Sequence, residues 1–352
     1  MNRPLRILHA IRSDGFAGVE QFVRRLAVAQ AEAGDRVHVI GGDPRRMSEV
    51  LGGAGVGFAP AARTAEVVRA IRELHTHVQV VNTHMTAADA AAVIALTGVR
   101  ARPAVVSTRH FARQRGRVGP VPIDAVVRRM IGHEIAISQA VAQMTSVPST
   151  VVHSGVEVVR STGTRIRRRT VLMAQRLEPE KATDVGIRAF AASGVAADGW
   201  TLEIAGRGTE QENLTRAAEA LGIGAVTRFL GFRNDLPDLM SEAGILLAPC
   251  PNEGLGLTVL EAMATALPVV AADGGGHAEL LEGLDERALF PIGDADRAAA
   301  ALRALAADPV ARAALGSRAQ LRQRESFTVA AQVEGTAKVY LAAIHGLDGT
   351  AP

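Results

Sequence analysis

Short apolar runs alternate with amphipathic segments along most of this chain, and the alternation occurs in two series. The apolar runs have the length and composition of buried strands. The segments between them, such as residues 19–34, place apolar residues three and four positions apart, which predicts helices, with Gly34 as a stop. Strand–helix alternation predicts parallel sheets covered by helices on both faces. The predicted strands are residues 5–11, 36–41, 78–83, 103–108, 134–138 and 150–153, then 170–174, 201–206, 226–231, 244–250 and 268–273.

The length of 352 residues exceeds what one hydrophobic core usually serves, so two domains are expected. The segment 155–169 is polar, basic and without periodicity, which marks it as the linker. The predicted divisions are an N-terminal domain over 1–158, a C-terminal domain over 159–330, and a last helix over 331–352 that crosses back to the first domain.

The amino-acid composition limits the class of protein to which this chain can belong. The 48% hydrophobic and 21% charged fractions are those of a soluble globular protein. A single cysteine, Cys250, forms no intrachain disulfide and favours a reducing compartment, so the cytoplasm is the expected location. No apolar run approaches the ~18 residues that cross a bilayer, and the apolar start is too short for a signal peptide. The 3% aromatic content argues against binding single-stranded nucleic acid by base stacking.

Arginine is concentrated in the first 158 residues, with 19 arginines against 12 acidic residues. Such a patch is suited to an anionic lipid surface or a phosphorylated acceptor, which predicts peripheral contact with the inner face of a membrane. The alternative is an ordinary solvated surface in an organism that prefers arginine to lysine. The arginines in question are Arg100, Arg102, Arg109, Arg113, Arg115, Arg117, Arg128 and Arg129.

The stretch EGLGLTVLEA, residues 253–262, joins a predicted strand to a predicted helix. Gly254 and Gly256 allow tight turns and close ligand approach, and the first amides of a helix favour an anion. Glu253 and Glu261 would repel a phosphate unless they bind other parts of the ligand, such as sugar hydroxyls. The stretch therefore suggests a nucleotide-sugar site. The alternative makes Glu253 a charge favoured by the helix dipole and Glu261 a solvated helix residue.

The frame E-G-x-G-L-x-x-L-E-A-M-A, followed by P-V-V-A, resembles the family 4 retaining glycosyltransferases. The segments AISQAV, VVHSGVE, RLEPEK, LEIAGRG and RFLGF fall in that family's order, so the resemblance covers essentially the whole chain. It implies the GT-B fold, with two Rossmann-like doubly wound parallel-sheet domains facing across a cleft. It further implies transfer of a sugar, with retention, from a nucleotide-diphospho-sugar. The basic N-terminal face suggests a glycan or lipid-linked acceptor, and neither a metal nor a further cofactor is expected.

The resemblance assigns roles to residues of the second series. Arg176 and Lys181 match the basic pair on the donor diphosphate, where a bidentate fork and a point charge suit a pyrophosphate. Glu261 is expected on the nucleotide ribose and Glu253 on hydroxyls of the transferred sugar. The further expected contacts are the backbone amides of Gly254, Leu255, Gly256 and Leu257 with sugar and phosphates, and Gly206 and Phe232 in the base pocket.

In the first series the resemblance points to two glycines and two histidines. Gly15 and Gly18 are expected beside the diphosphate. His110, in STRH, matches a histidine that contacts the donor sugar, and His84, in VNTH, is expected on the acceptor side.

The chain departs from the family pattern at four positions that bear on the hinge and on donor preference. Ser154 stands where the family has asparagine, and His153 where it has proline. Gln175 and Ala182 each replace a glycine beside the basic pair.

Three other interpretations remain at this stage. The DAD sequence at 294–296 is similar to the metal motif of another glycosyltransferase fold, but Asp294 is better explained as a helix cap. A nucleotide-sugar epimerase on the same fold would also need acids and phosphate-binding groups. A catalytically inactive carbohydrate- or nucleotide-binding scaffold is the alternative outside the enzymes.

Overall fold

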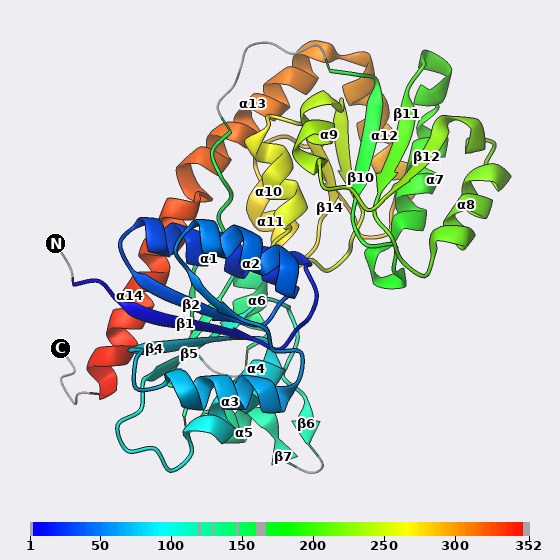
Figure 1. The fold of residues 1–352 in the computed structure, drawn as a ribbon. Helices are drawn as coiled ribbons and strands as arrows, with labels where there is room; N and C mark the ends of the chain where they lie inside the picture. Colours follow the sequence, from blue (N-terminus) through cyan, green and yellow to red (C-terminus); the bar gives the residue numbers. More distant parts are fainter. Residues whose placement is uncertain (1–2, 119–120, 129, 146–147, 160–166, 348–352) are drawn as a thin grey trace. The chain divides into compact units, whose positions relative to one another are not determined.

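The computed structural model describes residues 3–118, 121–128, 130–145, 148–159 and 167–347. Two compact units share the chain: Met1–Gly155 with Val329–Pro352, and Val156–Thr328 (Figure 1). Each unit holds a parallel sheet with helices packed on it, so the predicted doubly wound α/β fold class is confirmed. Part of the predicted linker, 160–166, lies outside the described residues.

The first unit is built on a seven-stranded sheet in the order β3-β2-β1-β4-β5-β8-β9, with every neighbouring pair parallel. Figure 1 shows α1 and α2 on one face and α3 and α4 on the other. The strands are β1 (Arg6–Ile11), β2 (Arg36–Ile40), β3 (Gly57–Ala59), β4 (Val80–His84), β5 (Ala104–Arg109), β8 (His133–Ala136) and β9 (Ser149–Val151). The helices are α1 (Gly18–Glu32), α2 (Pro44–Gly53), α3 (Thr64–Leu74), α4 (Thr86–Leu96), α5 (Ile123–Val127), α6 (Gln139–Gln143) and α14 (Val329–Leu347).

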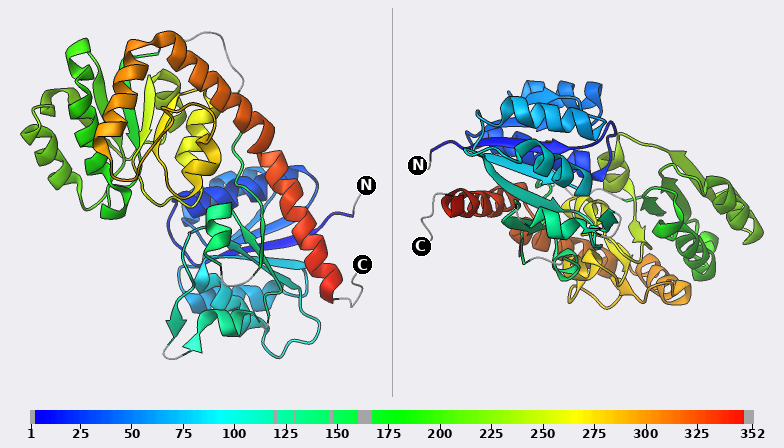
Figure 2. Two further views of the ribbon diagram at one scale, coloured as in Figure 1. Left: turned by 180° about the vertical axis from the view of Figure 1, so that it is seen from behind. Right: turned by 90° about the horizontal axis from the view of Figure 1, so that it is seen from below.

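The core of the first unit follows from the apolar pattern of its strands and helices. Ile71 of α3 and Leu96 of α4 are buried in one cluster with Leu8 of β1. The C-terminal helix α14 packs against α1, β5 and β8 (Figure 2). Its Tyr340 is fully buried, and the phenol oxygen accepts a 2.6 Å hydrogen bond from Asn82 Nδ2. A polar contact inside an apolar interface fixes the register of this helix on the sheet.

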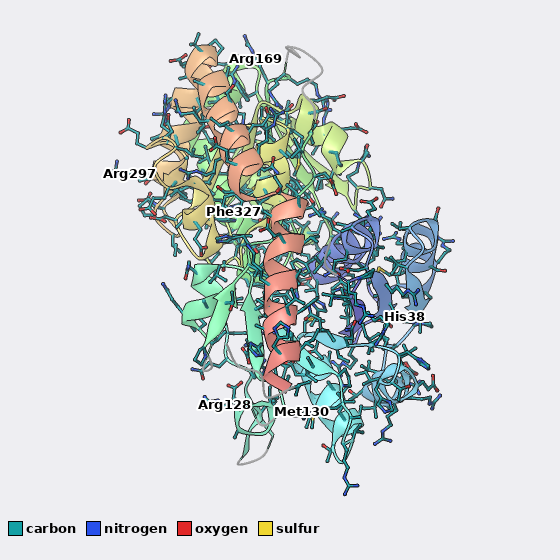
Figure 3. All side chains as sticks on the ribbon, turned by 90° about the vertical axis from the view of Figure 1, so that its left-hand side faces the viewer. His38, Arg128, Met130, Arg169, Arg297 and Phe327 are labelled. Atoms are coloured by element: carbon teal, nitrogen blue, oxygen red, sulfur yellow. The ribbon has the colours of Figure 1, made fainter. Side chains whose placement is uncertain are left out.

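The second unit is built on a six-stranded sheet in the order β12-β11-β10-β13-β14-β15, again with every neighbouring pair parallel. α7 packs against α12, and α10 packs against α9 and α13. At the end of α13, Phe327, labelled in Figure 3, accepts a hydrogen bond from the backbone N of Val156 at 3.1 Å. The strands are β10 (Thr170–Ala174), β11 (Thr201–Ala205), β12 (Thr227–Gly231), β13 (Ile245–Ala248), β14 (Val269–Ala272) and β15 (Leu289–Phe290). The helices are η1 (Pro179–Lys181), α7 (Thr183–Ser193), η2 (Val195–Asp198), α8 (Gln211–Ala220), η3 (Gly224–Val226), α9 (Leu236–Glu242), α10 (Leu257–Ala264), α11 (Gly276–Leu281), α12 (Ala295–Ala307) and α13 (Pro309–Ser326).

Every strand that the sequence predicts is found, with ends shifted by a few residues. The structure adds β3, β15 and a short antiparallel hairpin of β6 (Arg117–Val118) and β7 (Val121–Pro122). These strands have two or three residues each, too few to show a period of their own. Within the described part of the chain, no helix combines the length and the apolar character that a membrane crossing requires.

A buried ion cluster corrects the interpretation of the N-terminal arginines as one surface patch. The Arg115 guanidinium is fully buried and contacts Asp89 at 2.7 Å, Glu134 at 2.6 Å and Asp124 at 2.8 Å. Arg109 is also buried, and its Nη1 lies 3.9 Å from Glu134 Oε2. Sequence spacing carries no sign of this, because the partner carboxylates come from other elements. Arg100, Arg113 and Arg128 remain exposed, whereas Arg129 and the Arg117 side chain lie outside the described residues.

We predict that Arg115→Met lowers the free energy of unfolding by about 3–5 kcal/mol, because it leaves buried carboxylates without their counter-charge. Urea denaturation measures this change. Arg100→Met, at an exposed arginine, is the control and should stay within about 0.5 kcal/mol of the wild type. A loss below about 1 kcal/mol for Arg115→Met would show that the cluster does not support the fold.

Candidate functional site

The second sheet has a topological switch point between β10 and β13. From β10 the chain continues outward through β11 and β12, and it then returns to β13 on the other side of β10. Loops that leave the carboxyl ends of two such strands diverge and open a crevice, where ligands bind in open α/β sheets. The loop after β10 carries Arg176 and Lys181, and the loop after β13 carries Glu253.

Lys181 and Glu253 contact each other at this switch point. Lys181 ends the short helix η1, and its Nζ donates a hydrogen bond to Glu253 Oε1. The two side chains are only 16% and 26% exposed, so water screens this ion pair less than a surface pair. Lys181 is predicted to bind the diphosphate and Glu253 to bind the sugar. The two residues are far apart in the sequence, and the fold brings them into contact.

The start of α10 lies directly after Glu253. Gly256 caps the helix with φ at 99°, and a Cβ there would lie 2.8 Å from His277 Cδ2. Glycine is therefore required both by the backbone conformation and by the packed histidine. Gly254 and Leu255 are buried, and Leu257 is the first residue of α10. At a helix start the first N–H groups have no intrahelical acceptor, which makes this turn suited to an anion.

Glu261 and Arg176 are placed less tightly than the Lys181–Glu253 pair. Glu261 lies on α10, one turn after its first residue, and is half-buried. Arg176 is exposed, and its Nη2 pairs with Glu180 Oε1 at 2.7 Å. Arg176 donates to Glu180 and Lys181 donates to Glu253, so the two residues predicted to bind the diphosphate have different partners.

Gly206 and Phe232, the predicted base-pocket residues, follow the neighbouring strands β11 and β12. Gly206 has φ at 154°, and a Cβ there would lie 1.8 Å from the carbonyl oxygen of Gln175. Only glycine allows the loops after β10 and β11 to approach this closely. Phe232 is 47% exposed at the end of β12, which is an unusual exposure for an aromatic ring.

The structure adds His277 and the loop before it to the site. The backbone N of Gly276 donates to the carbonyl oxygen of Glu253 at 2.9 Å, so the loop after β14 holds the loop that carries Glu253. His277 is buried, which lowers the pKa of its ring, and its Nδ1 donates to the carbonyl oxygen of Ala272 at 3.2 Å. These residues were not predicted from the sequence, although the glycine run GGGH directly after a predicted strand was the signal for them.

Cys250 lies between the strand β13 and Glu253 and is buried. Burial raises the pKa of its thiol to about 11, and the neighbouring Glu253 carboxylate acts in the same direction. The thiol therefore stays protonated at neutral pH and is a poor nucleophile.

In the first unit, Gly15 and Gly18 lie between β1 and the first turn of α1. The backbone N of Gly15 donates to Ser13 Oγ at 3.0 Å, and the Glu20 carboxylate accepts from the backbone N of Ala17 at 2.9 Å. A Cβ at Gly18 would meet nothing within 4 Å, so packing inside this unit does not require glycine there.

His84 and His110 meet at the carboxyl ends of the neighbouring strands β4 and β5. His84 Nδ1 and His110 Nε2 are 3.0 Å apart, His84 Nε2 and His9 Nδ1 are 3.0 Å apart, and His9 Nε2 lies 2.7 Å from Gln30 Oε1. An amide oxygen can only accept, so His9 donates from Nε2, and His84 and His110 donate from their Nε2 atoms in turn. His9 was missed because it lies within an apolar strand, where it was interpreted as part of the core.

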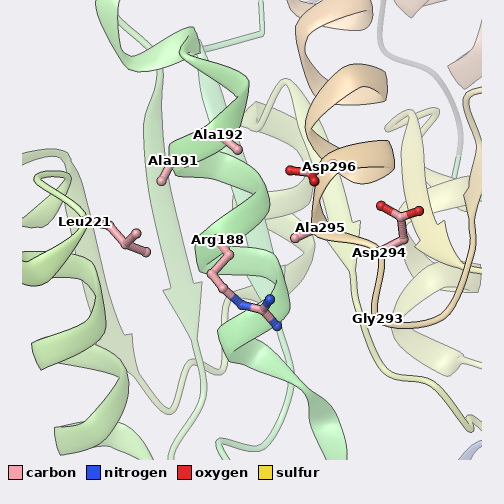
Figure 4. Close-up of a pocket in the computed structure, with 8 residues that line it drawn as sticks. All are labelled: Arg188, Ala191, Ala192, Leu221, Gly293, Asp294, Ala295 and Asp296. Carbon is pink, nitrogen blue, oxygen red and sulfur yellow. The ribbon is translucent and has the colours of Figure 1, made fainter.

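The sequence DAD at 294–296 has the role of a helix start. Asp294 Oδ1 accepts from the backbone N of Arg297 at 2.9 Å and begins α12, which confirms the predicted cap. A surface cavity of about 610 Å³ lies here between α7 and α12, with Arg188 and Asp296 among its lining residues (Figure 4). Among the described residues, no cluster of three or more histidine, cysteine or acidic side chains has an arrangement that could hold a metal ion.

The three linked histidines predict loss of stability in mild acid. Burial lowers the pKa of His9 to about 4 and that of His110 to about 3, and it lowers the pKa of His84 well below 6.5. Below about pH 6.5 the unfolded chain binds protons that the folded chain does not, so stability falls as the pH drops from 6.5 toward 4. At pH 5 the loss should be about 2 kcal/mol for each of His9 and His110, and His84 adds to it in the same direction.

Urea denaturation between pH 7.5 and 5 measures this loss. His9→Gln should make the pH dependence shallower, because it removes one of the three rings, while His77→Gln, at an exposed histidine, serves as the control. An unfolding free energy that is the same at pH 7.5 and 5 would contradict neutral, buried rings.

Comparison with known proteins finds a family model that matches part of this chain. Residues 158–322 match the family model described as glycosyl transferases group 1. The lipopolysaccharide core biosynthesis mannosyltransferase LpsB of Rhizobium meliloti (strain 1021) is 31% identical over 236 residues, which span 61% of this chain and 66% of that protein. The corresponding mannosyltransferase LpcC of Rhizobium leguminosarum bv. viciae is 29% identical over 232 residues, which span 61% of this chain and 65% of that protein.

Solved structures of low sequence identity share the fold over almost the whole chain. The crystal structure of Anabaena Alr3699/HepE in complex with UDP-glucose has a TM-score of 0.79 at 21% identity and covers 96% of this chain and 100% of its own. Sucrose-phosphate synthase from Thermosynechococcus elongatus has a TM-score of 0.74 at 16% identity and covers 97% of this chain and 100% of its own. At these identities the likeness shows the fold, which agrees with the predicted GT-B fold class of two parallel-sheet domains. Residues 158–322, which make up most of the second unit, are therefore similar to the glycosyl transferases group 1 family.

Proposed function

We propose that this protein is a retaining glycosyltransferase of family 4, which moves a sugar from a nucleotide-diphospho-sugar to a glycan or lipid-linked acceptor without a metal ion. The observation that carries the proposal is the contact between Lys181 and Glu253 at the switch point of the second sheet, directly before the first turn of α10. A cation, a carboxylate and a helix start at one point suit a ligand that joins a diphosphate to a polyhydroxylated ring.

In this proposal the Glu253 carboxylate stays paired with the Lys181 ammonium until the donor binds. The diphosphate then accepts hydrogen bonds from the Lys181 ammonium and from the first amides of α10, while Glu253 accepts from hydroxyls of the sugar. Arg176 is exposed and paired only with Glu180, so its long side chain is able to exchange that partner for the diphosphate. Glu261 accepts from the nucleotide ribose, and the base lies near Gly206 and Phe232.

The reaction breaks the bond between the anomeric carbon and the diphosphate oxygen, and the electron pair stays with the diphosphate. The acceptor hydroxyl oxygen forms the new bond from the same face, and its proton goes to the departing diphosphate. Lys181, Arg176 and the α10 amides stabilise the negative charge as it develops, which is worth several kcal/mol in a preorganised site. In the first unit, Gly15 and Gly18 are expected beside the diphosphate, His110 on the transferred sugar, and His84, which contacts His110, on the acceptor side.

The names of related proteins support a polysaccharide or lipopolysaccharide acceptor. LpsB and LpcC are named as mannosyltransferases of lipopolysaccharide core biosynthesis, and Alr3699/HepE is described in complexes with UDP and UDP-glucose. A lipid-linked acceptor of this class would bring the protein to the inner face of the membrane from the cytoplasm.

A thermal-shift panel of UDP-, GDP- and ADP-sugars tests the function. One nucleotide-sugar should stabilise the protein by about 2.7 kcal/mol at a hundred times its dissociation constant, and EDTA should leave turnover unchanged. Chromatography of the reaction then separates release of a nucleoside diphosphate from conversion of the donor into its epimer. Binding without either product would indicate a scaffold, and no binding of any nucleotide-sugar would contradict the proposal.

We predict that Lys181→Ala lowers turnover by about 100- to 1,000-fold while the melting temperature changes little, because it removes charge stabilisation of the leaving group. Lys338→Ala is the control, since Lys338 is the only other lysine and forms an exposed pair with Glu334.

Two arginines of the second unit form a matched pair of test and control residues. Arg176 and Arg188 are 59% and 52% exposed, and each pairs with a carboxylate four residues away.

Arg176→Ala should therefore weaken nucleoside diphosphate binding, whereas Arg188→Ala should not. Calorimetric titration with UDP and GDP measures both. Equal affinities for the two alanine variants would remove Arg176 from the site, and near-normal turnover of Lys181→Ala would remove Lys181 from the mechanism.

A further inference from the structure

The loop that follows β10 is held by the side chain of its own first residue. The backbone N of Gln175 donates to the carbonyl oxygen of Ala205 at 3.0 Å and continues the pairing of β10 with β11. The Gln175 side chain spans the loop, and its Nε2 donates to the carbonyl oxygen of Lys181 at 3.1 Å and to Thr183 Oγ1 at 2.8 Å. A carbonyl oxygen accepts only, so the contact with Lys181 fixes which end of the Gln175 amide points into the loop.

The two acceptors flank a residue in an unfavourable backbone conformation. Ala182 lies between Lys181 and Thr183, with φ at 49° and ψ at 40°, in the left-handed region. A residue with a Cβ populates this region rarely, because the Cβ approaches the following carbonyl oxygen. Ala182 has no polar side chain with which to stabilise its own turn, so the Gln175 amide supplies hydrogen bonds on both sides of it.

Other contacts hold the middle of the same loop. Glu178 Oε2 accepts from Thr209 Oγ1 at 2.7 Å, and the carbonyl oxygen of Glu180 lies 3.6 Å from Cys250 Sγ. Loss of the Gln175 amide would therefore leave residues 178–180 anchored and would remove the side-chain hydrogen bonds on both sides of Ala182, so that backbone hydrogen bonds to Glu178 and Pro179 are left to support its turn from the loop.

We infer that Gln175 is a positioning residue for Lys181: its side-chain amide holds the left-handed turn at Ala182 and so keeps the Lys181 ammonium beside Glu253. The role of this position in donor binding rests on the function proposed above. The coupling between Gln175 and Ala182 does not, because it is a property of the loop in the free protein.

A double-mutant cycle tests the coupling without any ligand. Gln175→Ala in the wild-type background should lower the melting temperature by about 2–4 °C, as expected for the loss of two hydrogen bonds in a domain of this size. In the Ala182→Gly background the same substitution should lower it by less than half as much, because glycine adopts the turn unaided. Equal losses in the two backgrounds would overturn the inference.

Nucleotide affinity tests the consequence for Lys181. Calorimetric titration with UDP, and with GDP if UDP does not bind, should show about tenfold weaker binding by Gln175→Ala and by the isosteric Gln175→Glu, which cannot donate to the Lys181 carbonyl. The Ala182→Gly substitution should restore most of the affinity lost in Gln175→Ala. Unchanged affinity in Gln175→Ala, or no restoration, would show that Gln175 is only a structural residue.

Gln320 provides the matched control. Its Nε2 donates to the carbonyl oxygen of Ala264 at 2.7 Å in the same unit, away from the Gln175 loop in the sequence. Gln320→Ala removes one hydrogen bond rather than two, so it should lower the melting temperature by about half as much and leave nucleotide affinity as in the wild type. If the wild-type protein binds none of UDP, GDP and ADP, with or without an attached sugar, the proposed function fails, while the melting temperatures still decide the coupling of Gln175 and Ala182.

Discussion

The contact between Lys181 and Glu253 depends on the direction of two neighbouring strands. β10 and β13 run parallel, so both end at the same edge of the sheet, and the loops after them diverge there. One loop brings a lysine and the other a glutamate that the next loop fixes through Gly276. If either strand ran in the opposite direction, the two side chains would lie at opposite edges of the sheet, and this contact would not form.

The same constraint organises the first unit. β4 and β5 are parallel neighbours, and their carboxyl ends bring His84 and His110 into contact, with His9 and Gln30 behind them. Burial keeps the rings neutral, and the amide of Gln30 sets the direction of their hydrogen bonds. The charged Arg115 of this unit lies among three carboxylates, and we expect this cluster to stabilise the fold.

The sequence predicted the architecture well because parallel strands leave a strong signal. Both faces of such a strand are covered, so runs such as VLMA (171–174) and ILLA (245–248) are apolar without interruption, and glycines mark the helix ends. Strands of two or three residues, such as β15, leave no period. The assignment of Lys181 and Glu253 to one ligand came from the resemblance to a family, and the roles of all site residues stay predictions.

Patterns along the chain determined the strand–helix alternation, the cap at Asp294 and the residues worth examining, because these depend on neighbours within a few positions. Tertiary structure alone decided which distant side chains meet. It paired Lys181 with Glu253, buried Arg115 among carboxylates and placed the Gln175 amide across its loop. Contacts of this kind join segments that folding brings together, and a sequence fixes the spacing of residues along the chain but not the distance between them in space.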